Sequence, residues 1–245
     1  MNSRIVTSFT AIALIAAMAL ATTNACAQRN NRKARGIKTE RTTANAQRKA
    51  TGTHNSGAVA RVSGTVDPNR WEGDKKTSVT FTAFPTTLAE WKAMQSQLGG
   101  EPQGAVALQV MAFELYRNNR TDGEAALRLN NTSTNYNSTV GRLREIMGKD
   151  QYYARPYIAW AMLKGATPEN GYQVRAPFTI DMKVDPNKRY QESQLLRGTV
   201  IYLLIDSKGW DTNWRGVEVV KPQGSDYYVV SNCPAMYTQC KQALK

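Results

Sequence analysis

Histidine is almost absent from this chain of 245 residues, which has a single one, His54, in a polar stretch near its start. Without a histidine in the segments patterned to fold, the chain lacks the general base of Ser-His-Asp and Cys-His enzymes. It also lacks the imidazole ligands of common zinc sites. Glycine-rich phosphate loops, a G-x-S-x-G turn and an H-E-x-x-H motif are missing as well. We therefore expect no metal and no cofactor.

Long apolar runs are also missing, except for one near the start of the chain. Residues 9–21 (FTAIALIAAMALA) follow Arg4 and are too few to span a bilayer comfortably. This pattern is typical of an export signal, which we expect to occupy residues 1–27. The expected location is the periplasm, the cell surface or the medium, with no transmembrane segment after the signal is removed.

The residues around Cys26 leave two possible ends for this signal. Residues 25–27 (Ala-Cys-Ala) form an A-x-A cleavage site, and cleavage there leaves Gln28 as the first residue. Alternatively, Cys26 carries a lipid anchor. Lipoprotein signals usually have Leu three residues before that cysteine, where this chain has Thr23, so the sequence favours cleavage.

Cysteine is scarce, and after Cys26 only Cys233 and Cys240 remain. An even pair in an oxidising compartment is most simply a disulfide. The six residues between them do not fit a C-x-x-C redox motif, and a Cys/His zinc site would have too few ligands. The pair therefore predicts a disulfide that closes a short loop.

Residues 28–57 concentrate the positive charge of a chain whose formal net charge is +13. The segment contains one large aliphatic residue, Ile37, and no aromatic residue, which predicts a disordered arm. A solvated spacer is the simpler interpretation, and attachment to an anionic surface is the alternative. Nucleic acid is disfavoured as a partner because the arm has no Phe, Tyr or Trp ring for base stacking.

Residues 58–245 are predicted to form a single α+β domain. About five helices are expected in a helical block at 86–165, and an antiparallel sheet of four to five strands is expected mainly in a β block at 172–245. Capping boxes at Thr87 and Thr121 predict two helix starts.

Three local expectations depend on residue spacing. Residues 130–137 are polar and predict a loop, whereas residues 155–163 predict a last helix. Residues 178–184 alternate apolar and polar side chains, which predicts a half-buried antiparallel strand.

Carboxylates offer the remaining route to an enzyme. A glycosidase needs two of them at a set separation across a cleft, and sequence alone does not give that separation. The acids in or near the β block are Glu169, Asp181, Glu192, Asp206, Asp211 and Glu218.

Aromatic residues favour binding. Trp210 and Trp214 flank a polar turn, where exposed rings can stack on sugars or anchor a protein partner. Burial in the core is the alternative. It is favoured for Trp214 because aromatic residues dominate burial, whereas for Trp210, next to Gly209 in a turn, neither alternative is preferred.

Four motifs stand out in the second half of the chain: Lys164–Tyr172 (KGATPENGY), Arg189–Ser193 (RYQES), Trp214–Val219 (WRGVEV) and Ser231–Cys240 (SNCPAMYTQC). Together they resemble an uncharacterised family of exported proteins from gut Bacteroidales and related bacteria, known as a domain of unknown function. The resemblance covers about residues 86–245, and it implies an envelope or secreted location and brings no assigned catalytic residue.

Two functional hypotheses follow. The first is a non-enzymatic exported module that binds an envelope polysaccharide or a protein partner, and the second is a carboxylate-dependent hydrolase acting on polysaccharide or cell wall. The candidate binding residues lie in or beside the polar motif loops: Glu169, Asn170, Arg189, Glu192, Trp210, Trp214 and Arg215.

Overall fold

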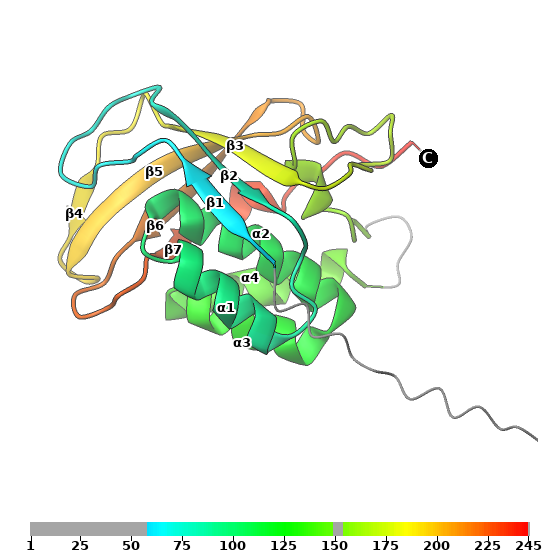
Figure 1. Cartoon of the computed structure of the whole chain (residues 1–245), viewed down its shortest axis with the longest axis horizontal. Helices are drawn as coiled ribbons and strands as arrows, with labels where there is room; N and C mark the ends of the chain where they lie inside the picture. Colours follow the sequence, from blue (N-terminus) through cyan, green and yellow to red (C-terminus); the bar gives the residue numbers. More distant parts are fainter. Residues whose placement is uncertain (1–57, 149–153, 245) are drawn as a thin grey trace, which may run out of the picture. The chain divides into compact units, whose positions relative to one another are not determined.

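The computed structural model describes residues 58–148 and 154–244, so the predicted signal (1–27) and basic arm (28–57) lie outside the described residues. In these ranges, four α-helices pack against one antiparallel sheet of seven strands (Figure 1). The helical segments are α1 (Leu88–Leu98), α2 (Pro102–Asn118), α3 (Arg120–Asn130), α4 (Ser133–Ile146) and the short 3-10 helices η1 (Trp160–Met162) and η2 (Pro234–Met236).

The sheet has the strand order β1-β2-β3-β5-β6-β7, and β4 pairs with β5 beside this path. Because β1 and β2 precede the helices and the other strands follow them, the helical block is inserted between two parts of one sheet. The strands are β1 (Ala60–Ser63), β2 (Lys76–Phe81), β3 (Phe178–Val184), β4 (Gln191–Ser193), β5 (Gly198–Asp206), β6 (Trp214–Val220) and β7 (Val229–Asn232).

The helix starts follow from capping side chains. Thr87 Oγ1 accepts a hydrogen bond from the Glu90 backbone N–H at 3.2 Å, as the capping box predicts. Helix α2 begins at Pro102, where a proline loses no backbone hydrogen bond, and it is buried almost all round from Pro102 to Tyr116. It is therefore the central helix of the hydrophobic core.

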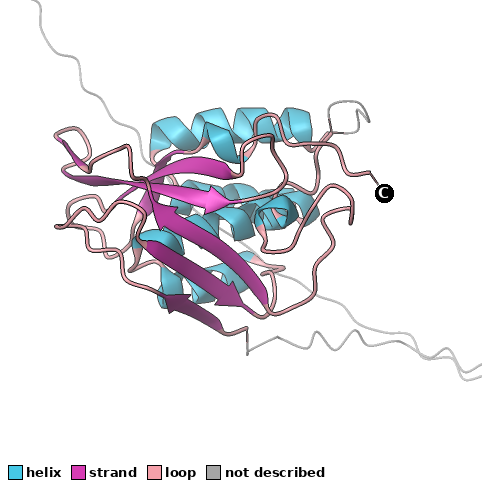
Figure 2. Ribbon diagram, turned by 90° about the horizontal axis from the view of Figure 1, so that it is seen from above, coloured by secondary structure: helices cyan, strands magenta, loops and turns pink. Residues whose placement is uncertain are grey.

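The two faces of the sheet differ because strand side chains alternate. Val79, Ile180 and Leu203 are fully buried on the side where the helices pack. The alternate positions, such as Ser78 and Asp181, face the other way and are partly exposed. We call this second side the outer face, and Figure 2 shows the strands with the helices behind them.

The predicted α+β class is confirmed, but both element counts are wrong. The described residues contain four α-helices instead of about five, and seven strands instead of four to five. Residues 155–163 form consecutive turns and the short η1 instead of a helix, with i to i+3 bonds such as Ile158 N to Arg155 O. Tyr157 is held at its hydroxyl by the backbone N–H of Ala243, which ties this segment to the C-terminal tail.

The predicted loop at 130–137 is also wrong, because α4 begins at Ser133 after the N-cap Thr132. The side chains of the asparagines that predicted a loop point into the protein interior. Asn131 Nδ2 donates to Gln109 Oε1 at 2.8 Å, and Asn135 Nδ2 donates to Asn131 Oδ1 at 2.6 Å. Buried amides satisfied in this way are compatible with a helix.

The predicted disulfide is wrong, because Cys233 and Cys240 are buried free thiols. The short helix η2 separates them, and their sulfur atoms face different surroundings. Cys233 Sγ lies 3.4 Å from Asn135 Nδ2, whereas Cys240 Sγ lies 4.0 Å from the Tyr172 hydroxyl.

Candidate functional site

The outer face brings together polar side chains from several strands. The strand register places Ser78 opposite Asp181 and Asp206 opposite Trp214. These side chains surround a hollow of about 480 Å³, which we call the Trp214 hollow. It is lined by Ser63, Gly64, Lys76, Thr77, Ser78, Lys164, Asp181, Met182, Asp206 and Trp214.

Trp214 is the aromatic wall of this hollow. Its side chain is 38% exposed, so the expected burial of this residue is wrong. Lys183 Nζ lies 4.4 Å from the centroid of the indole ring and 2.7 Å from Asp74 Oδ1. The ring is thus held by a cation–π contact whose lysine is itself held by a carboxylate.

Two lysine–carboxylate pairs involve acids that line the hollow. Lys164 Nζ lies 2.9 Å from Asp181 Oδ2, and hydrogen bonding to Asp181 raises the pKa of this lysine. Lys208 Nζ lies 3.5 Å from Asp206 Oδ1, an atom without a hydrogen-bond donor among the described residues. The hollow therefore presents charged donors and acceptors side by side.

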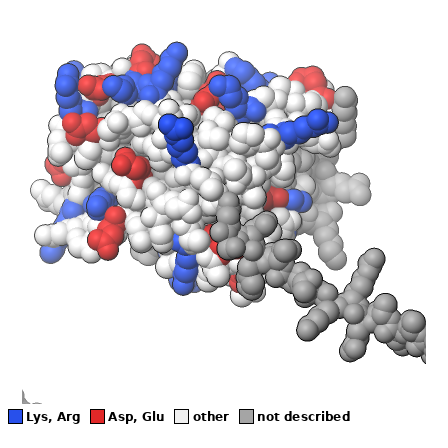
Figure 3. All heavy atoms as spheres, viewed as in Figure 1, with Lys and Arg blue, Asp and Glu red and all other residues white. Residues whose placement is uncertain are grey.

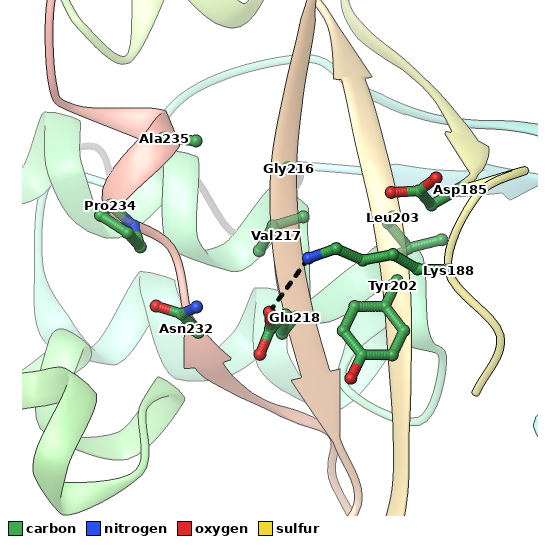
Figure 4. Close-up of a pocket in the computed structure, with 10 residues that line it drawn as sticks. All are labelled: Asp185, Lys188, Tyr202, Leu203, Gly216, Val217, Glu218, Asn232, Pro234 and Ala235. Carbon is green, nitrogen blue, oxygen red and sulfur yellow. Dashed lines mark ion pairs between the residues drawn. The ribbon is translucent and has the colours of Figure 1, made fainter. Parts of the chain in front are cut away.

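A second, smaller hollow of about 160 Å³ lies further along β5 and β6, and we call it the Glu218 hollow (Figure 4). Lys188 reaches across it, with Nζ 3.7 Å from Glu218 Oε1 and 5.0 Å from the centroid of the Tyr202 ring. Partial burial raises the pKa of Tyr202. The lining residues are Asp185, Lys188, Tyr202, Leu203, Gly216, Val217, Glu218, Asn232, Pro234 and Ala235.

Two of the predicted binding residues shape a loop instead of a hollow. Asn170 Oδ1 accepts from Thr167 N at 3.0 Å, and Asn170 Nδ2 donates to Gly165 O at 2.9 Å. Glu169 is exposed beside them, and its own backbone N–H, followed by the Thr167 hydroxyl, lowers the pKa of its carboxyl. Asn170 therefore closes the turn between η1 and β3.

Two others lie apart from this loop and from each other. The Arg189 guanidinium carbon lies 4.4 Å from the centroid of the Trp71 ring. Glu192, on the short strand β4, accepts a hydrogen bond from the Thr199 hydroxyl of the neighbouring strand. Neither residue lines the Trp214 hollow or the Glu218 hollow.

Trp210 and Arg215 form a structural pair. Trp210 is 2% exposed, and its Nε1 donates to Thr238 O at 2.6 Å. Arg215 lies 5.2 Å from the centroid of that ring and donates from Nε to Ala235 O at 2.9 Å, and burial lowers its pKa. These contacts fix η2 against β6, beside the Glu218 hollow.

The predicted residues thus do not converge, and of the seven only Trp214 lines either outer-face hollow. Sequence reasoning missed the lysines, Lys76 and Lys164 at the Trp214 hollow and Lys188 at the Glu218 hollow. One signal was available for one of them: Lys76 is an alternate position of a strand whose other face is apolar.

A third hollow of about 470 Å³ lies away from the outer face, at the C-terminal end of α2 and the turns around η1. Tyr157 and Tyr172 stack there with ring centroids 4.9 Å apart. Among the described residues, no cluster of three or more His, Cys, Asp or Glu side chains is arranged to hold a metal ion. None of the helices in the same ranges has both the length and the apolar character needed to cross a membrane.

The fold and its outer face define an α+β domain that leaves one side of its sheet open. The family model for a domain of unknown function, DUF6935, matches residues 83–243, and the chain belongs to this family. Searches of curated proteins and of solved structures each give no significant match.

Proposed function

We propose that this protein is an exported, non-enzymatic binding module of the cell envelope and that its outer face binds carbohydrate. The single observation that carries the proposal is the partly exposed ring of Trp214, held by Lys183 at the edge of a polar hollow. Export rests on the signal pattern at residues 1–27.

Carbohydrate fits this combination of groups. A pyranose ring has one face of C–H groups, whose positive edges suit the negative face of an aromatic ring. Its hydroxyls both donate and accept hydrogen bonds. Lys164 and Asp181 offer a charged donor and a charged acceptor 2.9 Å apart, so that neighbouring hydroxyls can bind one to each.

The charge balance favours a neutral ligand. A polyanion is recognised by an excess of positive charge. The residues that line the two outer-face hollows carry no such excess. Figure 3 shows acidic and basic side chains interspersed over the face seen in Figure 1. Three lysines and four carboxylates line the two outer-face hollows: Lys76, Lys164 and Lys188, with Asp181, Asp185, Asp206 and Glu218.

The alternative function, a carboxylate-dependent hydrolase, is favoured by one observation. The register of β3 and β5 pairs Lys183 with Leu204. Two residues further along each strand, the same register puts Asp181 opposite Asp206. A retaining glycosidase uses two carboxyls about 5 Å apart, one of them protonated. Lys164 Nζ lies 2.9 Å from Asp181 Oδ2 and so engages one of these two carboxylates in an ion pair, which makes binding without hydrolysis the better supported function.

The decisive experiment is to screen the protein without its signal on an array of neutral and acidic glycans, beside Trp214→Ala and Trp214→Phe variants. We expect binding to neutral glycans that the Ala variant loses and the Phe variant largely keeps. Leu195→Ala, at a side chain that is 92% exposed, is the matched control and should bind like the parent protein. Binding that is unaffected by Trp214→Ala, or no binding at all, would overturn the proposed site.

Two further measurements test the other parts of the proposal. Hydrolysis of the bound glycan, detected as the release of reducing ends, would overturn the non-enzymatic role. The export proposal predicts that the protein isolated from its host begins at Gln28, and an intact Met1 in the cytoplasm would contradict it.

A further inference from the structure

We infer that the ligand is an extended glycan chain that lies along β6, from the Trp214 hollow across Gly216 to the Glu218 hollow. This inference rests on the proposed function and adds the shape of the ligand to it. A site for one sugar would need only the Trp214 hollow.

The two hollows follow one another along the same strands. Outward positions of β6 recur at Trp214, Gly216 and Glu218, and the register places Asp206, Leu204 and Tyr202 opposite them on β5. Four residues of strand extend about 13 Å. This distance is longer than one sugar ring, so a ligand that contacts both hollows must be a chain.

Gly216 lies at the middle of this path, and nothing in the fold requires a glycine there. A Cβ atom added at this position would meet only Leu204 Cδ2, at 3.9 Å, which is an ordinary van der Waals contact. The bulge between β6 and β7 lies further on, at Glu218 and Val219. Glycine inside a strand weakens the strand, and one of its established uses is to let a ligand approach the backbone closely.

The walls beside Gly216 are held in place by contacts on both sides. Lys183 fixes the Trp214 ring, and Arg215 bonds to Ala235 O of η2, which borders the Glu218 hollow. A site whose walls are already ordered loses less entropy when a ligand binds. Arg215 is therefore a positioning residue of the path.

The far end of the path also suits a sugar. Tyr202 offers part of an aromatic ring, and Lys188 and Glu218 offer a donor and an acceptor 3.7 Å apart. The Asn232 amide is exposed and makes no side-chain hydrogen bond to any described residue, so it is open to a hydroxyl. Figure 4 shows Asn232 and Glu218 on neighbouring strands.

The test is isothermal titration calorimetry of the protein without its signal, using cello-, xylo-, manno-, malto- and chito-oligosaccharides from monosaccharide to hexasaccharide. For the sugar type that binds, affinity should rise by about tenfold or more with chain length, as expected for one added subsite, and then level off. Gly216→Val fills the middle of the path with a good strand former and should remove this gain, while the shortest ligand that binds keeps its affinity within about twofold.

The controls keep the outcomes separate. Gly141→Val alters an exposed glycine of α4 with no neighbouring atom within 4 Å and should bind like the parent protein. If Gly216→Val fails to fold, Asn232→Ala should reduce the chain-length gain instead. Trp214-dependent binding without any chain-length gain would overturn the extended chain and leave the proposed function standing. No binding by any oligosaccharide, or binding of a protein partner alone, would overturn both.

Discussion

Lys183 lies over the indole ring of Trp214, with Nζ 4.4 Å from the ring centroid, while the same ammonium group pairs with Asp74 at 2.7 Å. These three side chains come from β3, β6 and the turn before β2, so the contact links distant parts of the chain. It holds the only exposed tryptophan among the described residues in one orientation.

The first prediction concerns this contact. Lys183→Met keeps an unbranched side chain that is one atom shorter and removes its charge, so the ring loses its cation–π partner and Asp74 loses its ion pair. We expect a free energy of unfolding lower by about 0.5–1.5 kcal/mol and glycan binding weaker by about threefold to tenfold. Urea denaturation and calorimetry with the best-binding glycan measure the two effects. Lys92→Met, at an exposed position on α1, is the control, and equal binding by both variants would contradict the prediction.

The second prediction concerns the buried amide cluster between α2, α3 and α4. Gln109 Oε1 accepts from Asn130 Nδ2 at 3.0 Å and from Asn131 Nδ2 at 2.8 Å. Gln109→Leu leaves two buried donors each short of one acceptor, which should lower the free energy of unfolding by about 2–4 kcal/mol. Urea denaturation measures it, with the exposed Gln194→Leu as control. A loss as small as that of the control would show that the cluster rearranges.

These examples show how far the sequence predicts the fold. The alternation in residues 178–184 and the capping box at Thr87 each depend on neighbouring residues, and both predictions agree with the structure. The sequence does not predict the start of α4, because a polar residue such as Asn131 locally indicates a loop. Its hydrogen-bond acceptor, Gln109, is distant in sequence. Polar residues whose hydrogen-bond partners lie far along the chain cannot be placed from local patterns.

The site was harder to predict for a related reason. Trp210 and Trp214 flank the same turn, and only the register that pairs Asp206 with Trp214 decides which ring faces outward. The turn before β6 then places Trp210 in the core, against the backbone of Thr238. A change of one residue in register would exchange the two faces of the strand, and sequence spacing does not set that register.

The third prediction concerns the two thiols. Mass spectrometry after alkylation in denaturant without reductant should show both Cys233 and Cys240 modified, whereas the native protein should react slowly because both are buried. If neither cysteine is modified in denaturant, the two cysteines form a disulfide, and the prediction of free thiols is wrong. The Cys240→Ser variant provides a control with one reactive thiol.

The fourth prediction follows from the pKa values of these thiols. Burial raises the pKa of Cys233 from 9.0 to about 11 and that of Cys240 to about 12. The unfolded chain therefore loses these protons first as pH rises, so the contribution of the two thiols to the free energy of unfolding is fully present below about pH 9 and is lost progressively as pH rises through the folded pKa values. From pH 9 to 10 these two thiols should lower the free energy of unfolding by about 1–2 kcal/mol, in addition to the decrease from the tyrosines, which begin to titrate in the unfolded chain over the same range. Urea denaturation across this range measures the slope, and Cys233→Ala should reduce it; an unchanged slope would contradict the assignment to Cys233.

The last prediction separates a structural role from a binding role for Asn170. Its side chain makes two hydrogen bonds, to Thr167 N and to Gly165 O, that close the turn before β3. Asn170→Ala should lower the free energy of unfolding by about 1–2 kcal/mol and leave glycan affinity within about twofold, because the turn lies outside both outer-face hollows. Glu169→Ala, at the exposed neighbouring position, should change neither quantity by as much. Urea denaturation and calorimetry on the same samples decide the matter: lost binding with unchanged stability would make Asn170 a ligand contact and move the site to this turn.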